Sequence, residues 1–150
     1  MIALDKTVPE ETATPPPALA DGLEISFPTG LVGCPDWRNF VFRLTPEHAP
    51  ISALENLDDP AISLSVIDPF ILRPDYAIDM SESDTQLIEL EDAADAAVLA
   101  ILVVKHEPTL VTANLVGPIV INSRTNLACQ LVLDNPEYSV RQLVYSEAAE

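Results

Sequence analysis

Three aspartates and two histidines are the side chains best suited to acid–base chemistry in this chain. Asp58 and Asp59 are adjacent, Asp68 follows them, and the histidines are His48 and His106. If these carboxylates met a histidine in one pocket, they could act as the general acid and base of a hydrolase. Neighbouring carboxylates in an Asp-Asp-Pro turn usually point apart and cap backbone N–H groups instead. The sequence therefore favours capping, with a carboxylate-based hydrolase as an alternative function.

The two cysteines form no metal or redox motif. Cys34 and Cys129 are far apart in the sequence and neither has a histidine close by, whereas a zinc site needs closely spaced Cys and His ligands. We expect both to be reduced thiols in or near the core. The chain also lacks the GxSxG, P-loop and GxGxxG patterns, and it has only 4 glycines. No cofactor is expected, and a binding module is favoured over an enzyme.

Negative charge is the strongest chemical feature of the chain. It has 7 Lys plus Arg against 24 Asp plus Glu, a formal net charge of -17 at pH 7. The few basic residues are too scattered to follow a phosphate backbone, so we expect no direct binding to nucleic acid. A chain this acidic suits a cationic partner, such as a basic protein surface or a metal ion.

The acidic residues are concentrated between Pro74 and Val104. This window contains no basic residue and carries a charge of -8, while the other residues together carry -9. Solubility alone would explain such a surface. A field directed at a cationic partner is the functional alternative. The acids of the window are Asp75, Asp79, Glu82, Asp84, Glu89, Glu91, Asp92 and Asp95.

The elements that carry these groups are predicted to be mainly strands. Alternating or continuous apolar residues predict strands near 23–27, 37–44, 51–57, 61–67, 98–104, 111–122, 127–133 and 140–145. The 98–104 segment is wholly apolar, so we expect it to be buried on both faces. Gly117-Pro118 predicts a kink or bulge in one long strand. Ser81 and Asp84 resemble a capping box and predict the start of a helix.

These elements predict one all-β domain with minor α content. We expect a mainly antiparallel, β-barrel-like fold of residues 21–150 with one or two short helices. Residues 1–20 are rich in proline and predict an acidic flexible tail. The longest apolar run, residues 96–104, is too short to span a bilayer, and the start of the chain lacks the features of a secretory signal. We therefore expect a cytoplasmic protein that does not enter a membrane.

Four segments together resemble the FliW family of flagellar assembly factors. They occur in the family's order and spacing, and the resemblance covers about residues 22–145. The segments are FPTGLVGCPDWRNFVF at 27–42, NLDDPAISLSVIDPF at 56–70 with PDY at 74–76, ANLVGPIVIN at 113–122, and QLVLDNPEYSVR at 130–141.

The resemblance implies a small cytoplasmic β-barrel-like protein that has two protein partners. One is flagellin, the filament subunit. The other is CsrA, a small basic dimer that binds messenger RNA and represses flagellin translation. The family's role implies partner switching, in which the free protein binds CsrA and relieves repression, while accumulating flagellin captures the protein and frees CsrA. No enzyme activity and no cofactor are implied.

The charge and the resemblance together indicate where CsrA would bind. An acidic protein docked beside the RNA site of a basic dimer would attract the dimer and repel RNA. We expect the window from Asp75 to Asp95 to supply that field, with Asp75, Asp79, Glu82 and Asp84 as the acids that bind the partner. The alternative is a merely solvated helix and loop.

Aromatic residues in the preceding loop suggest a second contact. Four residues follow a strand end in a Pro-bounded segment and could form a hydrophobic site for a flagellin helix: Phe70, Ile71, Leu72 and Tyr76. Alternatively, they are part of a lid that packs over the end of the barrel. A further alternative function, a small-ligand-binding barrel, would require an apolar internal cavity.

Overall fold

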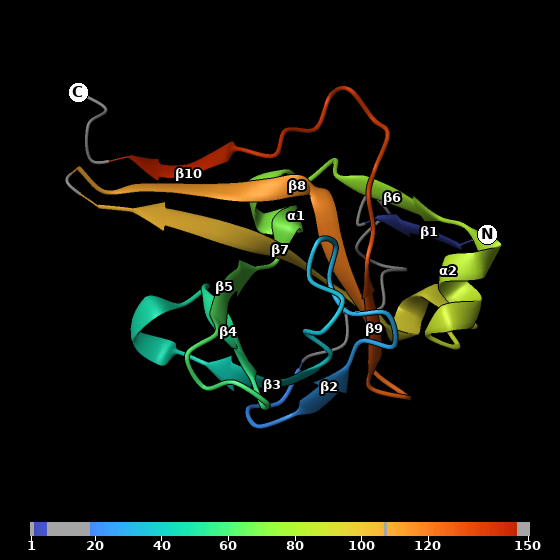
Figure 1. The fold of residues 1–150 in the computed structure, drawn as a ribbon. Helices are drawn as coiled ribbons and strands as arrows, with labels where there is room; N and C mark the ends of the chain where they lie inside the picture. The colour runs from blue at the N-terminus through green and yellow to red at the C-terminus, as the bar shows by residue number, and fades with distance from the viewer. Residues whose placement is uncertain (1, 6–18, 107, 147–150) are drawn as a thin grey trace.

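The computed structural model describes residues 2–5, 19–106 and 108–146. The helices are α1 (Pro69–Leu72) and α2 (Glu82–Leu87), and short 3-10 turns occur at η2 (Pro46–His48) and η3 (Ala93–Asp95). The strands are β1 (Ile2–Asp5), β2 (Glu24–Ser26), β3 (Asn39–Leu44), β4 (Ser52–Asn56), β5 (Ser63–Ile67), β6 (Ala77–Met80), β7 (Ala96–Lys105), β8 (Leu110–Asn122), β9 (Leu127–Gln130) and β10 (Gln142–Ser146). The expectation of an all-β fold with one or two short helices is confirmed (Figure 1).

A closed barrel forms the centre of the molecule. Its strands follow the order β8-β7-β5-β4-β3-β2-β9, and β9 pairs with β8 to close the ring. The pairings are antiparallel except for a single parallel contact between β2 and β9, at Ser26 and Leu127. Closure leaves no free strand edge within the ring, so the backbone polar groups of the barrel find partners there.

Strand β8 bends where the sequence places Gly117-Pro118. Leu99 of β7 pairs with Ile119, but Ile101 pairs with Asn114, so the register slips across the bend. The Asn114 side-chain oxygen accepts hydrogen bonds from the N–H groups of Val116 and Gly117, each at 3.0 Å. The expected kink in one long strand is confirmed, and the Asn114 amide satisfies backbone N–H groups at the bend.

Two apolar clusters lie on opposite faces of the β7–β8 wall. One fills the barrel and includes Phe27 and Phe40, whose rings meet edge to face with centroids 5.4 Å apart. The other lies outside the barrel, between this wall and a layer made of α1, β6 and α2, and it includes Ile78 and Met80 of β6. Burial on both faces explains why the sequence of β7 is continuously apolar rather than alternating.

The far end of β7 departs from that expectation. Val103 is 50% and Val104 41% exposed, although we expected the whole segment to be buried. Strand β5 pairs with β7 only at Ala100 and Ile101, so residues 102–105 of β7 run beyond the barrel. There it joins the first half of β8 and β10 in a three-stranded extension, seen on the left of Figure 1. We call this extension the ribbon and define it as residues 102–105, 110–114 and 142–146.

The amino terminus forms a strand that the sequence did not predict. Ile2–Asp5 pairs antiparallel with β6, from Ile2 opposite Met80 to Asp5 opposite Ala77. The expectation of a flexible tail over residues 1–20 is therefore wrong for these four residues, because the backbone edge of β6 offers hydrogen-bond partners that no local pattern reveals. The proline-rich part of the predicted tail lies outside the described residues.

Candidate functional site

The predicted acidic residues lie on the layer that covers the outside of the barrel. In β6, Ile78 and Met80 are buried against the barrel wall, while Ala77 and Asp79 are exposed. This alternation follows from the two-residue period of a strand and directs Asp79 to solvent. Figure 1 shows β6, β1 and α2 together on the right of the molecule, at the end opposite the ribbon.

Helix α2 begins where the capping pattern predicts. Ser81 is its N-cap, and the Ser81 hydroxyl accepts a hydrogen bond from the N–H of Asp84 at 3.2 Å. The same hydroxyl donates to the Asp84 carboxylate at 2.9 Å. Thr85 and Ile88 face the core, which leaves Glu82 exposed on the first turn. Negative charge at this position is favourable because the N-terminus of a helix carries partial positive charge.

A buried amide holds the segment after α2 against the barrel. Asn122, at the end of β8, is 2% exposed, and its side-chain nitrogen donates to the carbonyls of Ile88 at 2.9 Å and Glu89 at 3.0 Å. Its side-chain oxygen accepts from the N–H of Arg124 at 3.0 Å. Asn122 is therefore a fully satisfied structural amide. It also fixes the position of Glu89, whose backbone has a φ of 56°.

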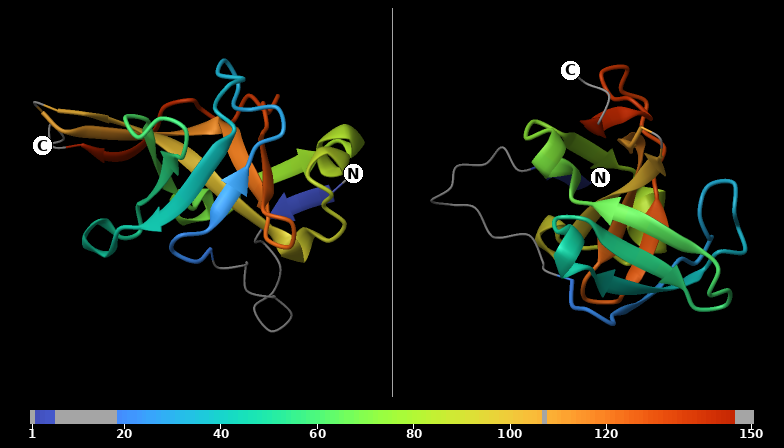
Figure 2. Two further views of the ribbon diagram at one scale, coloured as in Figure 1. Left: turned by 60° about the horizontal axis from the view of Figure 1, so that its bottom comes forward. Right: turned by 90° about the vertical axis from the view of Figure 1, so that its left-hand side faces the viewer.

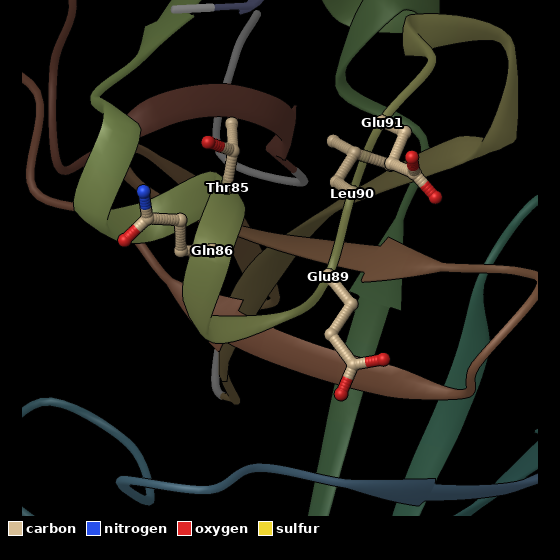
Figure 3. Close-up of a pocket in the computed structure, with 5 residues that line it drawn as sticks. All are labelled: Thr85, Gln86, Glu89, Leu90 and Glu91. Atoms are coloured by element: carbon tan, nitrogen blue, oxygen red, sulfur yellow. The ribbon is translucent and has the colours of Figure 1, made fainter.

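A pocket of about 320 Å³ lies beside this segment and is lined by Thr85, Gln86, Glu89, Leu90 and Glu91 (Figure 3). The carboxylates of Glu89 and Glu91 point in different directions in this view. Across the described part of the chain, no group of three or more His, Cys, Asp or Glu side chains is placed to hold a metal ion. The pocket is therefore best described as a depression in an acidic face.

Asp75 differs from the other predicted carboxylates because it is paired. Its carboxylate accepts a hydrogen bond from Arg73 Nε at 3.0 Å, and this bond lowers the pKa of Asp75. Arg73 also donates to the backbone and side-chain oxygens of Glu137, at 2.9 and 3.2 Å, and lies 4.8 Å from the centre of the Tyr138 ring. Sequence reasoning missed this role of Arg73, since Glu137 lies 64 residues further along the chain.

Asp79 and Glu82 therefore carry the least compensated charge of the predicted set. Both are exposed, and neither forms an ion pair with any residue that the structure describes. The same holds for Glu89 and Glu91 on the neighbouring segment. The structure thus brings the predicted acids to one layer, with Asp75 neutralised by Arg73 and Asp84 engaged by Ser81.

The predicted aromatic contact site is corrected by the structure. Tyr76 is completely buried, its hydroxyl donates to the Leu115 carbonyl at 2.6 Å, and burial raises its pKa. Phe70 is half-buried and packs edge to face on Tyr76, with ring centroids 5.8 Å apart. The expectation that Tyr76 contacts a partner is therefore wrong, and the two rings pack against the outside of the barrel wall rather than over the end of the barrel. Ile71, which is 55% exposed, is the neighbouring apolar side chain that solvent reaches.

The carboxylates considered for hydrolysis are engaged in local structure. Asp59 accepts from the N–H of Ala61 at 3.0 Å, and Asp68 accepts from the N–H of Phe70 at 2.9 Å as the N-cap of α1. Asp58 accepts from the side chain of Asn39 at 3.2 Å. The preference for capping is confirmed for Asp59 but not for Asp58, whose partner is a side chain, and the described residues give the hydrolase alternative no converging site.

The remaining alternatives also receive no support from the described residues. Large apolar side chains fill the barrel where a small-ligand site would need a cavity. Cys129 is buried, and burial raises the pKa of its thiol to about 12, while Cys34 is half-buried; both are free, as expected. None of the described helices has the length and apolar character needed to cross a membrane.

Comparison with known proteins gives a consistent result. A family model described as FliW protein matches residues 10–144. The chain is 35% identical over 124 residues to a flagellar assembly factor FliW of Bacillus licheniformis, covering 83% of this chain and 87% of that protein. It is 37% identical over 108 residues to a flagellar assembly factor FliW of Pseudothermotoga lettingae, covering 71% of this chain and 69% of that protein. A crystal structure of the flagellar assembly factor FliW superposes with a TM-score of 0.75 at 26% identity, covering 97% of this chain and 98% of that one.

Proposed function

The chain belongs to the FliW family of flagellar assembly factors, and from this premise we propose that it is a non-catalytic cytoplasmic regulator that binds CsrA and flagellin in turn. The observation that carries the CsrA part of this proposal is the acidic layer outside the barrel. There Asp79 and Glu82 are exposed and form no ion pair with a described residue. A basic dimer would find uncompensated negative charge on a preformed surface.

The range of this field sets the geometry of the proposed complex. At physiological ionic strength the Debye length is about 8 Å, so the layer acts only on groups close to it. It would attract basic side chains on CsrA and repel phosphates that approach the same area. CsrA bound beside its RNA site would therefore lose affinity for RNA. Complementary charge of this kind mainly accelerates association and gives specificity.

Flagellin completes the proposed cycle by competing for the regulator. Of the predicted apolar site, Tyr76 is buried and so lies out of reach of a flagellin helix. Ile71 is the exposed apolar residue on α1, so it is the part of that segment able to contact a flagellin helix. We propose that flagellin binding and CsrA binding exclude one another on the regulator.

Neutralising Asp79 and Glu82, which pair with no described residue, tests the CsrA part. We expect the double variant Asp79→Asn/Glu82→Gln to bind CsrA about tenfold more weakly at low salt, since rim charges act mainly through the association rate. The dependence of Kd on salt between about 50 and about 300 mM NaCl should flatten as well. Isothermal titration calorimetry with purified CsrA measures both quantities.

A matched variant separates the site from the total charge. Asp36→Asn/Glu47→Gln removes the same charge from exposed positions outside the acidic layer. We expect it to change the CsrA Kd by less than about twofold. If the two double variants show the same Kd and the same salt slope, the acidic layer is not the CsrA contact.

A further inference from the structure

The bend in β8 brings two side-chain amides together on one face of the sheet. A Cβ added to Gly117 would lie 2.9 Å from Gln130 Nε2 and 3.0 Å from Asn114 Nδ2, so both amides lie over this glycine. Gln130 also accepts a hydrogen bond from the N–H of Val32 at 2.9 Å and donates to the Gly117 carbonyl at 3.0 Å. The Gln130 amide therefore ties the loop that carries Val32 to the bend.

Exposed apolar side chains continue this face onto the ribbon. Thr112 lies two residues before Asn114 in β8, so the two side chains are on the same side of the sheet. Thr112 lies opposite Leu143 of β10 and opposite Val103 of β7. Directly opposite residues share a face, and Leu143 and Val103 are 54% and 50% exposed.

A further exposed valine lies at the bend itself. Hydrogen bonds of 2.8 and 2.7 Å join the backbone on either side of Val132 to the backbone on either side of Gly117, so these two residues lie opposite each other. The same register pairs Gln130 with Ile119, whose side chain fills the barrel. Val132 is 69% exposed, and Val32, beside Gln130, is 60% exposed.

We call this surface the neutral face. Apolar side chains gathered on one face of a sheet indicate a contact surface, and the amides between them would orient a bound partner. In a chain with a net charge of -17, six side chains without charge make up this face: Val103, Thr112, Asn114, Gln130, Val132 and Leu143.

The two ends of the neutral face differ in charge. At the ribbon end, Lys105 lies two residues after Val103 and Arg141 lies two residues before Leu143. Both are exposed, and neither forms an ion pair with a described residue. At the other end Asp134, also exposed, follows Val132 by two residues. A partner with negative charge at one end of its contact segment would therefore fit in one orientation.

The neutral face suits a helix rather than an added strand. Thr112 has strand partners on both sides, and Gly117 faces Val132, so the backbone there is already engaged. A helix binds through apolar side chains that recur every three to four residues. The rows at Thr112 and Gly117 are five residues apart along β8, or about 17 Å of extended strand, which matches about three helical turns.

We propose that the neutral face binds an amphipathic helix of flagellin, with acidic side chains of that helix beside Lys105 and Arg141. This inference rests on the proposed function, which supplies flagellin as the partner. Charge complementarity favours flagellin over the basic CsrA here, because two unpaired cations border the ribbon end.

The neutral face is then an anchoring contact apart from the acidic layer. Figures 1 and 2 place the ribbon at one end of the molecule and α2 with β6 at the other. Ile71 lies on α1, within the layer that carries the acids, so competition with CsrA would arise there and not at the neutral face. Variants of the neutral face should consequently affect flagellin binding alone.

Isothermal titration calorimetry with purified monomeric flagellin tests the apolar part. Leu143→Gln should weaken flagellin binding about fivefold or more, because it places a polar amide against the apolar face of the helix. Leu57→Gln is the matched control, since Leu57 is 48% exposed and lies outside the neutral face. It should change the Kd by less than about twofold. Binding of CsrA should be the same in both variants and in the native chain.

Removing the two cations tests the orientation. Lys105→Gln/Arg141→Gln should weaken flagellin binding about fivefold at low salt, and the loss should shrink at high salt. Arg43→Gln/Arg124→Gln removes the same charge from exposed positions elsewhere and should have an effect below about twofold.

The outcomes separate this inference from the proposed function. If the native chain binds flagellin and the neutral-face variants bind it equally well, flagellin uses another surface and only this inference is overturned. A neutral-face variant that weakens CsrA and flagellin binding alike also overturns it, because the contact would not be separate. A native chain that does not bind flagellin overturns the proposed function and this inference together.

Discussion

Gly30→Ala is expected to lower the free energy of unfolding by about 3 kcal/mol or more, the largest effect that we predict for a single methyl group. Gly30 has a φ of +71°, which side chains rarely adopt. An added Cβ would also overlap the backbone oxygen of Pro35 and lie 2.7 Å from the Pro35 Cα. The backbone of Pro35 cannot move aside to relieve this overlap as a flexible side chain would.

The surrounding loop has little freedom to relax. Leu31 and Cys34 exchange two backbone hydrogen bonds, of 3.1 and 2.8 Å, which close the turn between Gly30 and Pro35. Leu31 is 6% exposed and packs with the cluster inside the barrel. Moving Pro35 away from a new Cβ would therefore disturb either this turn or the packing at the end of the barrel.

Urea unfolding followed by the fluorescence of Trp37, the only tryptophan, measures the effect. Gly33→Ala is a close control, because Gly33 has a similar φ of +81° but no atom lies within 4 Å of the place that its new methyl group would take. We expect Gly33→Ala to lower the free energy of unfolding by about 1 kcal/mol, because only the backbone conformation opposes the new side chain. Equal losses in the two variants would show that the close contact with Pro35 does not determine stability.

Asn122→Ala is expected to lower the free energy of unfolding by about 2 to 4 kcal/mol, which is the second large effect that we predict. The substitution removes three hydrogen bonds at a residue that is 2% exposed. The Ile88 carbonyl then keeps its 3.2 Å hydrogen bond from the Thr125 hydroxyl, whereas the Glu89 carbonyl loses its bond from Asn122, and the space left by the buried amide adds the cost of a cavity. The segment after α2 should loosen first, since Asn122 is its link to β8.

Hydrogen exchange combined with urea unfolding separates a local from a global effect. We expect faster amide exchange in α2 and the residues after it, together with the lower free energy of unfolding. Asn39→Ala is the control, because Asn39 is exposed and bonds to Asp58 at 3.2 Å. A cost below about 0.5 kcal/mol is expected there. If Asn122→Ala proves as mild as the control, Asn122 does not anchor the acidic segment.

Local chemistry explains why much of the fold could be predicted from the sequence. Alternation identified β3 and β5, and the continuous apolar run identified β7 as a strand with two covered faces. Gly117-Pro118 located the bend in β8, and Ser81 with Asp84 located the start of α2. Each of these features depends on residues close together in the chain, whose spacing follows directly from strand or helix geometry.

Features that depend on distant residues could not be predicted in this way. Strand β1 exists because β6, far along the chain, offers it an edge. Tyrosine is a residue type that is common at contact surfaces, but the Tyr76 side chain lies in the core, where its hydroxyl donates a hydrogen bond to the Leu115 carbonyl of β8. Periodicity shows that a residue has a covered face, but it does not show which element covers it. The acidic window was visible in the sequence, whereas the pairing of Arg73 with Glu137, 64 residues further along the chain, required the structure.

Competition between the two proposed partners tests partner switching most directly. CsrA is bound to a fluorescent RNA carrying its site in the flagellin message, and the native protein is added while fluorescence anisotropy is recorded. Partner switching predicts that RNA is released, and that added flagellin restores RNA binding without contacting the RNA itself. Unchanged anisotropy on adding the protein, or release that flagellin cannot reverse, would contradict it.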